Sequence, residues 1–523
     1  MTGIRQLAAV LRERYACGDQ DYWMTPLVRR ESDVPVGRIC DRDVVVFCCR
    51  RGDRETQLTE AFIDPRFDQF PIVAFRDLSF IPFVLYHEKF SHLTPVFAIL
   101  RPDKTFGEVL SRAGLKQLRV AESEKAAHVT FFFNGRRVDP FVGEDRTVVP
   151  SPPSSLFLEK PGTSTAGVAA RVEEAIESDE YDFILANLAA GDIIGHLDSW
   201  DANVKCAEAV DHALGRICEA ALKKRGYCVA VTADHGVLER ARHSDGTPSL
   251  EHTASLVPFG LICEGLTKAG TVIAQGRTLA DVAPSLLEMM KLPIPAEMTG
   301  KSLIKHTGAS YKCVLVVLDG WGIGSDDPEV NPIARAHTPM MDIIMRNYPF
   351  APLSASGPAV GLPNGRAGNS ETGHLTLGAG RMIPQDELRI QRAVEDGTLA
   401  NSETLSSAFR LLRSRNGKLH VIMLLSEKSS HGNINEGLAV VEAARACGVK
   451  DIYVHLILDG RSSPPQGAAD LLRLLEREES KESARVSVVT AIGRAYALDR
   501  SKSYREKTQL AYRALVWGEG RPF

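Results

Sequence analysis

A short apolar run that ends in an acid places the strongest constraint on the fold of this 523-residue chain. Residues 314–318 read Val-Leu-Val-Val-Leu and are followed by Asp319, Gly320, Trp321 and Gly322. A continuous run of β-branched and aliphatic residues predicts a buried parallel strand that delivers Asp319 to its carboxyl end. In open α/β sheets, ligands bind at that end of the strands.

Further along, residues 368–374 (Gly-Asn-Ser-Glu-Thr-Gly-His) place Ser370 between a glycine-containing turn and a predicted helix start. The N–H groups and the dipole at a helix start favour an ionised oxygen and a bound phosphate. Because a serine hydroxyl is a weak nucleophile, it needs a base, a lowered pKa or a metal to react. The rest of the chain is expected to supply that activation.

Two more predicted strands lead into acids and histidines. Residues 183–187 precede Asp192 and His196, which are four apart and therefore lie on one face of a helical turn, where both can reach one cation. Residues 228–232 precede a second acid and imidazole. Singly, such residues are equally typical of capping acids and core histidines. As a set they offer seven ligands, enough for two divalent cations with open positions: Asp192, His196, Asp234, His235, His252, Asp319 and Ser370.

Composition narrows the function classes. The formal net charge of −4 and the pI near 6.4 argue against a nucleic-acid or membrane-surface partner, so an anionic ligand needs a local arginine cluster. Ten cysteines without a C-x-x-C pair predict reduced thiols in a cytoplasmic protein. No apolar run approaches the roughly 20 residues that span a bilayer. Residues 1–15 form an amphipathic helical pattern without the apolar core of a signal peptide.

Local patterns predict several further elements. We expect a strand at residues 43–47, a strand at 129–133 and a helix at 165–178, with a domain boundary near Pro102. Lys125, just before the second of these strands, fits either a surface lysine or one that reaches into a site.

Five groups of motifs, spread over almost the whole chain, occur together. They are residues 232–236 (Thr-Ala-Asp-His-Gly), 298–303 (Met-Thr-Gly-Lys-Ser-Leu), 318–322 (Leu-Asp-Gly-Trp-Gly), 368–374, and 459–461 (Asp-Gly-Arg). With these motifs the chain resembles the cofactor-independent (2,3-bisphosphoglycerate-independent) phosphoglycerate mutases of the alkaline phosphatase superfamily.

The resemblance implies two α/β domains in a circularly permuted order. The family begins with the motif at 318–322 and ends near the motif at 298–303, whereas here the ending precedes the beginning. A phosphatase-like metal and nucleophile domain is then expected at 102–384. A smaller transferase domain that holds the substrate is expected from 1–101 together with 385–523.

The resemblance also implies a reaction and its residues. One Mn2+ would be held by Asp192, His196 and His252. A second would be held by Asp319, Ser370, Asp234 and His235, with Zn2+, Mg2+ or Co2+ suited to similar ligands. Ser370 would carry the phosphoryl group between 3-phosphoglycerate and 2-phosphoglycerate, without bisphosphoglycerate, and Lys125 would neutralise its charge. The substrate contacts implied in the smaller domain are Arg51, Arg54, His431, Arg461, Ser462, Arg494 and Arg500. The expected protein is a cytoplasmic monomer of glycolysis and gluconeogenesis with a small-molecule substrate.

The sequence departs from the family pattern mainly among the substrate contacts. Ser462 replaces an acid of the family motif, Cys49-Arg50 replaces Asn-Phe, and residues 426–433 lose glycines and a second histidine, with Asn433 in its place. Val237 replaces an asparagine. Since serine cannot act as a carboxylate base, two alternatives remain open: a metal-dependent phosphomonoesterase of the same superfamily, and a degenerate relative that does not turn over.

Overall fold

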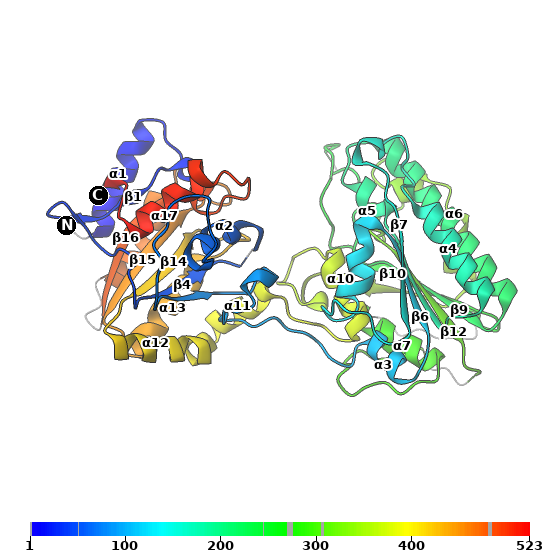
Figure 1. Ribbon diagram of the computed structural model, residues 1–523. Coiled ribbons are helices and arrows are strands. Elements are labelled where there is room, and N and C mark those ends of the chain that lie inside the picture. The colour runs from blue at the N-terminus through cyan, green and yellow to red at the C-terminus, as the bar shows by residue number, and fades with distance from the viewer. Residues whose placement is uncertain (1–2, 51, 244, 269–275, 305–307, 480–483) are drawn as a thin grey trace. The chain divides into compact units, whose positions relative to one another are not determined.

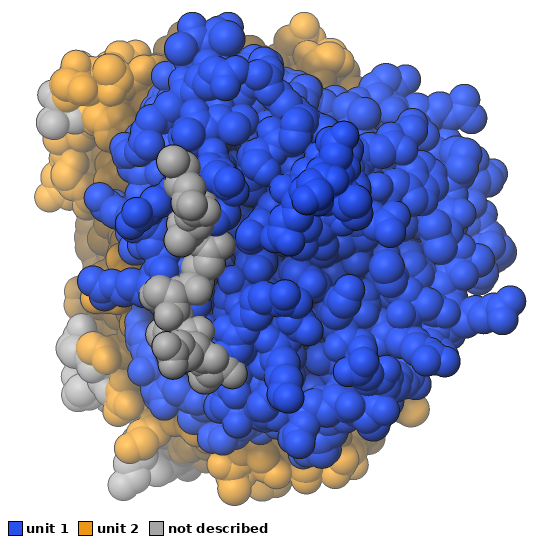
Figure 2. All heavy atoms as spheres, turned by 90° about the vertical axis from the view of Figure 1, so that its left-hand side faces the viewer, with its two compact units in different colours: residues 1–99, 386–523 blue, residues 100–385 orange. Residues whose placement is uncertain are grey.

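The computed structural model describes residues 3–50, 52–243, 245–268, 276–304, 308–479 and 484–523, which divide into two compact units (Figure 1). Unit 1 comprises residues 1–99 and 386–523, and unit 2 comprises residues 100–385; Figure 2 colours them blue and orange. The sequence-based division placed the boundaries after residues 101 and 384.

Unit 1 is a seven-stranded sheet in the order β17-β1-β16-β15-β14-β4-β5. The neighbouring pairs from β16 to β5 are parallel, β1 is antiparallel to β16, and β2 and β3 form a separate hairpin. The strands are β1 (Leu27–Val28), β2 (Arg30–Glu31), β3 (Val34–Pro35), β4 (Val44–Cys48), β5 (Ser79–Pro82), β14 (Leu419–Leu425), β15 (Asp451–Leu458), β16 (Arg485–Gly493) and β17 (Arg521–Pro522).

Alternation along β4 shows why this sheet is covered on both faces. Val44 and Val46 belong to one apolar core, whereas Val45 and Phe47 belong to another, because successive side chains of a strand point to opposite faces. Helices therefore pack on either side of the sheet. They are α1 (Gly3–Ala16), α2 (Gly52–Ile63), α11 (Asp386–Glu395), α12 (Glu403–Arg415), α13 (Ile434–Ala446), α14 (Ala468–Leu471), α15 (Arg473–Glu479), α16 (Arg494–Ala497) and α17 (Gln509–Val516).

Unit 2 is an eight-stranded sheet in the order β11-β13-β10-β9-β12-β8-β6-β7. The neighbours from β9 to β7 are parallel, and β10 is antiparallel to both β9 and β13. The strands are β6 (Gln117–Glu122), β7 (Glu144–Val149), β8 (Phe183–Leu188), β9 (Tyr227–Thr232), β10 (Val257–Ile262), β11 (Arg277–Thr278), β12 (Lys312–Leu318) and β13 (Phe350–Ser354).

Helices α4 and α6 cover one face of this sheet, and α7 and α10 lie on the other (Figure 1). The helix predicted at 165–178 is confirmed as α4, and α6 follows the short α5. The helices are α3 (Phe106–Arg112), α4 (Thr165–Ser178), α5 (Ala190–Gly195), α6 (Trp200–Lys224), α7 (Val282–Met289), α8 (Pro332–Arg335), α9 (Pro339–Asn347) and α10 (Ser370–Ala379). In the described part of the chain, no helix is both long and apolar enough to cross a membrane.

The strand predicted at 129–133 is wrong. His128–Phe132 form a single π-helical turn, in which the Thr130 hydroxyl donates to the Ala126 carbonyl oxygen at 2.7 Å. Phe133 packs against the rings of Phe106 and Phe183 in the core of unit 2. Aromatic and β-branched residues favour any half-buried surface, and here tertiary packing outweighs their strand preference.

Candidate active site

Three adjacent parallel strands of unit 2 end beside one another, and each is followed by an acid of the predicted set. β12 ends at Leu318 and is followed directly by Asp319. Its neighbour β8, in which Leu188 is the register partner of Leu318, leads into α5 and Asp192. On the other side, β9 is followed by Asp234. Parallel pairing thus gathers the three carboxylates at one edge of the sheet.

Helix α10 brings the serine to the same edge. Ser370 is its first residue, and the side chain of Asn369 caps the helix by accepting the Thr372 N–H at 2.9 Å. A Cβ atom on Gly373 would lie 2.6 Å from the Asp234 carbonyl oxygen. Only glycine therefore allows the first turn of α10 to pack directly on the segment that carries Asp234.

The Ser370 hydroxyl lies in a buried polar cluster. Its Oγ is 2.6 Å from Lys125 Nζ, 3.0 Å from His235 Nε2 and 3.1 Å from Asp319 Oδ1. Lys125 also donates to Asp192 Oδ2 at 2.7 Å and to Asp319 Oδ1 at 2.8 Å. Of the two positions that the sequence left open for Lys125, the structure gives the buried one, with 5% of the residue exposed.

His196 and His252 converge on the outer side of Asp192. Their Nε2 atoms are 3.0 Å apart and lie 3.3 and 3.1 Å from Asp192 Oδ1. Each Nδ1 faces a backbone carbonyl oxygen, of Leu250 at 2.7 Å and of Gly368 at 2.9 Å, so each ring donates from Nδ1 and, when neutral, presents a lone pair at Nε2. Two imidazole lone pairs and a carboxylate oxygen that face one another repel unless a cation lies among them. This arrangement is typical of a metal site with oriented histidine ligands.

A third group contains His374, which belongs to the motif at 368–374 but was not among the predicted ligands. His374 Nδ1 is 3.4 Å from Asp234 Oδ2, and its Nε2 is 3.1 Å from the side-chain nitrogen of Asn187, which also donates to Asp319 Oδ2 at 2.7 Å. The spacing of His374, four residues after Ser370 on one helix face, was an available signal.

The ligand atoms fit divalent cations. Three groups of side chains each gather their ligand atoms within 4.8 Å of one another. Within the described residues, the buried Asp192 Oδ1 and Asp234 Oδ2 accept no hydrogen bond. Buried carboxylate oxygens without donors are costly unless a cation is bound, so the arrangement suits a metal ion. The groups are Asp192, His196 and His252; Asp192, His235 and Asp319; and Asp234, Asp319 and His374.

The charges in this cluster shift the pKa values of its members. Burial alone would lower the pKa of His235, but Asp234 and the other two carboxylates raise it to about 9. Burial would likewise lower the pKa of Lys125, yet Asp319 and Asp192 raise it above its usual range. Burial, assisted by His374 and Lys125, lowers the pKa of His128 to about 4. The cluster therefore holds Lys125 as a cation and His128 as a neutral ring at neutral pH.

Unit 1 gathers some of the predicted substrate contacts. The Arg494 guanidinium forms an ion pair with Asp459 Oδ1 and contacts His431 Nε2 at 2.9 Å. The other oxygen of Asp459 accepts the Ser462 N–H at 2.7 Å. Arg494 is 3% exposed and His431 is 2% exposed, so the pair is fixed in the wall of unit 1.

The remaining predicted contacts lie around this pair. Arg54 is buried and donates to the Leu498 carbonyl oxygen at 3.3 Å. Arg461 and Arg500 are exposed, on the segments that follow β15 and α16. The prediction for Arg51 falls outside the described residues.

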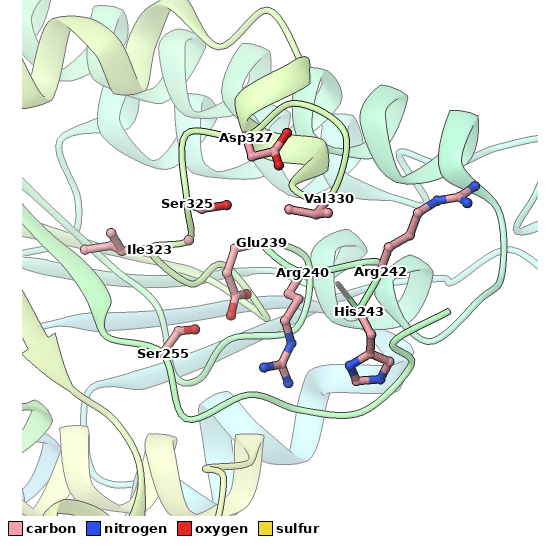
Figure 3. Close-up of a pocket in the computed structure, with 10 residues that line it drawn as sticks. Glu239, Arg240, Arg242, His243, Ser255, Ile323, Ser325, Asp327 and Val330 are labelled. Atoms are coloured by element: carbon pink, nitrogen blue, oxygen red, sulfur yellow. The ribbon is translucent and has the colours of Figure 1, made fainter. Parts of the chain in front are cut away.

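A separate cavity of about 670 Å3 opens in unit 2, and none of the predicted ligands lines it (Figure 3). Its walls come from the segment between β9 and β10 and from the loop that follows β12, and Glu239 and Arg240 project from the first of these (Figure 3). The lining residues are Glu239, Arg240, Arg242, His243, Ser255, Ile323, Gly324, Ser325, Asp327 and Val330.

Comparison with known families matches two parts of the chain. Residues 38–294 match the Metalloenzyme superfamily, and residues 390–522 match the family described as the BPG-independent PGAM N-terminus. The resemblance stated from the sequence and the predicted α/β fold class are thereby confirmed.

Individual relatives match over about half of their length. A 2,3-bisphosphoglycerate-independent phosphoglycerate mutase of Thermosynechococcus vestitus is 39% identical over 301 residues, which cover 56% of this chain and 55% of the relative. The protein of the same name from Nitrosococcus oceani is 41% identical over 278 residues, covering 52% and 53%. The chain thus spans about half the length of the curated relatives that it matches.

A solved structure of Leishmania mexicana phosphoglycerate mutase at low cobalt concentration aligns with 28% identity and a TM-score of 0.41. The alignment covers 53% of each chain. Residues 38–294, just under half of the chain, are thus similar to the Metalloenzyme superfamily, and residues 390–522 are similar to the BPG-independent PGAM N-terminus.

Proposed function

We propose that this chain is a metal-dependent phosphoglycerate mutase that interconverts 3-phosphoglycerate and 2-phosphoglycerate through a phosphoserine on Ser370. The observation that carries the proposal is the meeting of Lys125, His235 and Asp319 on the Ser370 hydroxyl at the start of α10. The names of the relatives, which match half of their length, support the substrate.

The reaction consists of two transfers that leave the protein unchanged. In the first, Ser370 Oγ loses its proton and bonds to phosphorus, and the bond from phosphorus to the 3-oxygen breaks. The electron pair stays on the 3-oxygen, which takes up a proton. In the second, the 2-oxygen of the same glycerate loses its proton and bonds to phosphorus, and the bond from phosphorus to Ser370 Oγ breaks. The electron pair stays on Oγ, which takes up a proton, so that Ser370 recovers its hydroxyl. The Lys125 ammonium holds positive charge beside the transferring group, which stabilises phosphoryl transfer.

We propose two Mn2+ ions as the resident metals. Asp192, His196 and His252 hold one. Asp319, Ser370, Asp234 and His235 hold the other, and His374 is an additional candidate ligand or orienting residue at that group. When bound, such ions lower the pKa of a coordinated hydroxyl and neutralise phosphoryl charge.

The Arg494 group of unit 1 is proposed to bind the glycerate carboxylate and hydroxyls. Guanidinium groups suit planar anions, and Arg494 is already oriented by Asp459 and His431. Arg51, Arg54, Arg461, Ser462 and Arg500 are proposed to complete this group.

We also propose that the order of the chain is circularly permuted. The family described as an N-terminus matches residues 390–522, which follow the metalloenzyme match at 38–294. Unit 2, which carries all the proposed metal ligands, is then a continuous segment, whereas unit 1 is built from both ends.

Monomeric function in the cytoplasm is part of the proposal. All ten cysteines of the chain are unpaired, which supports a reducing compartment.

The test is a coupled assay for 2-phosphoglycerate formed from 3-phosphoglycerate, with Mn2+ and without bisphosphoglycerate. Free phosphate is followed in the same sample. Product without free phosphate is expected, and its absence from a folded, Mn2+-loaded protein would refute the mutase proposal.

A phosphomonoesterase is the second candidate, and Ser462 is the observation that favours it. The Ser462 backbone N–H binds Asp459, but its side chain is exposed and carries no carboxylate to direct the glycerate hydroxyls. Water would then attack the phosphoserine, and free phosphate would appear without 2-phosphoglycerate.

A further inference from the structure

Two departures from the family pattern meet in unit 1. Arg50 follows β4 and belongs to the departing pair Cys49-Arg50, and Ser429 and Ser430 belong to the departing segment 426–433. Although far apart in sequence, Arg50 and this segment are in contact. The Arg50 N–H donates to the His431 carbonyl oxygen at 3.0 Å.

The Arg50 side chain holds the same segment. Its Nη2 donates to the Ser429 carbonyl oxygen at 3.1 Å, and its Nε lies 3.4 Å from the Ser430 carbonyl oxygen. One arginine thereby contacts three successive carbonyl oxygens that lead up to the His431 side chain. The loss of glycines from residues 426–433 does not by itself hold this loop in one conformation. The three contacts with Arg50 do restrain the backbone that carries His431.

Two acids fix the guanidinium in turn. Glu436, in the first turn of α13, forms a close ion pair with Arg50 Nη1, and Glu387 of α11 lies 3.4 Å from Nη2. The Arg50 side chain is 9% exposed and that of Glu436 is 5% exposed. Because a planar guanidinium binds several acceptors in a fixed geometry, this set holds one arrangement of the segment.

Stability alone does not account for the ion pair. Burial raises the pKa of Glu436 to about 7 in spite of the neighbouring Arg50, so the ionised pair is disfavoured relative to exposed groups. The second oxygen of Glu436, among the described residues, accepts no hydrogen bond. A buried pair of this kind is better explained by the geometry that it imposes on its neighbours.

We propose that Arg50 and Glu436 are positioning residues for substrate binding: they fix the segment 429–431 and thereby set the His431 ring against Arg494. This proposal deepens the proposed function, since it assigns a role in holding the glycerate part of the substrate. Neither residue needs to touch the substrate. Both act through His431, whose Nε2 contacts Arg494 at 2.9 Å.

The test compares Arg50→Ala with Arg445→Ala. Arg445 is a matched control, because it is equally buried, at 6% side-chain exposure. It also binds two acids and one carbonyl oxygen in unit 1 (Glu442 and Glu478, and the Glu478 carbonyl). We expect similar losses of thermal stability from the two substitutions. Only Arg50→Ala should raise KM for 3-phosphoglycerate, by tenfold or more, with kcat changed less than threefold, since it weakens ground-state and transition-state binding alike.

Conservative variants separate positioning from charge. Arg50→Lys retains the charge but not the planar guanidinium, so its KM should lie between those of the wild-type protein and Arg50→Ala. Glu436→Gln should also give a KM between these two values. Equal KM changes in Arg50→Ala and Arg445→Ala, or full recovery by lysine, would overturn the proposal.

A readout that does not depend on turnover separates this inference from the proposed function. In protein labelled with 15N-histidine, the His431 imidazole signal, assigned by its loss in His431→Gln, should shift in Arg50→Ala and stay in place in Arg445→Ala. A His431 signal that is unchanged in Arg50→Ala would refute the positioning role, whether or not the wild-type protein interconverts phosphoglycerates. A shifted signal in a protein without mutase activity would retain the positioning role and reject the reaction.

Discussion

Removal of the Lys125 ammonium is expected to destabilise the metal-free protein much more than the metal-loaded protein. In Lys125→Met, the side chain keeps its approximate length but loses the charge that lies 2.7 Å from Asp192 and 2.8 Å from Asp319. Both carboxylates are buried, and without a cation at least one of them is left uncompensated.

The magnitude follows from the burial of the pair. Breaking a buried ion pair by removing one partner costs about 3–5 kcal/mol. For a domain of this size, 1 kcal/mol shifts Tm by about 2–4 °C, so the metal-free variant should melt roughly 6–20 °C below the wild-type protein. With bound cations the carboxylates are neutralised, and the difference should fall below about 5 °C. The rate of phosphoryl transfer in the loaded variant should still fall by roughly 10²–10³-fold.

Scanning calorimetry with EDTA and with Mn2+ measures both differences in Tm. The unfolding transition to compare is the one whose Tm is shifted by Mn2+. Lys116→Met is the control, because the exposed Lys116 pairs with Glu180 at the surface, and its loss should change Tm by little. An equal fall in Tm for Lys125→Met with and without Mn2+ would refute the reasoning, since it would mean that Lys125 contributes by packing rather than by charge.

Three further predictions test the site and the fold. Ser370→Ala should abolish mutase and phosphatase turnover while circular dichroism and Tm in EDTA stay near those of the wild-type protein; turnover above background would reject the nucleophile. Ser462→Asp should raise the ratio of 2-phosphoglycerate to free phosphate if the phosphomonoesterase alternative holds, and an unchanged ratio counts against that alternative. Burial lowers the pKa values of His420 and His455, which are hydrogen-bonded to each other inside unit 1. Below about pH 6.5 the unfolded state therefore binds more protons than the folded state. The free energy of unfolding should accordingly decrease as the pH falls below this value, by up to about 2.7 kcal/mol per pH unit. Urea midpoints at pH 7.5 and 5.5 measure this loss, and equal midpoints would contradict it.

The sequence by itself determined the α/β class and the elements whose residues carry a local signal. The apolar run before Asp319 is β12, the pattern at 165–178 is α4, and Ser370 begins α10. In each case the information is local: a continuous apolar run, a 3.6-residue period, or a capping residue at a helix start.

Tertiary structure alone decided the features that depend on partners distant in the sequence. The facing lone pairs of His196 and His252 arise from backbone carbonyls of other loops, and the contact of Arg50 with Ser429 joins β4 to the segment before α13. Residues 129–133 favoured a strand by their side chains, yet form a helical turn because the core of unit 2 receives Phe133 there. Local preference is worth well under the free energy of burying a large aromatic side chain, so packing across the chain decides such segments.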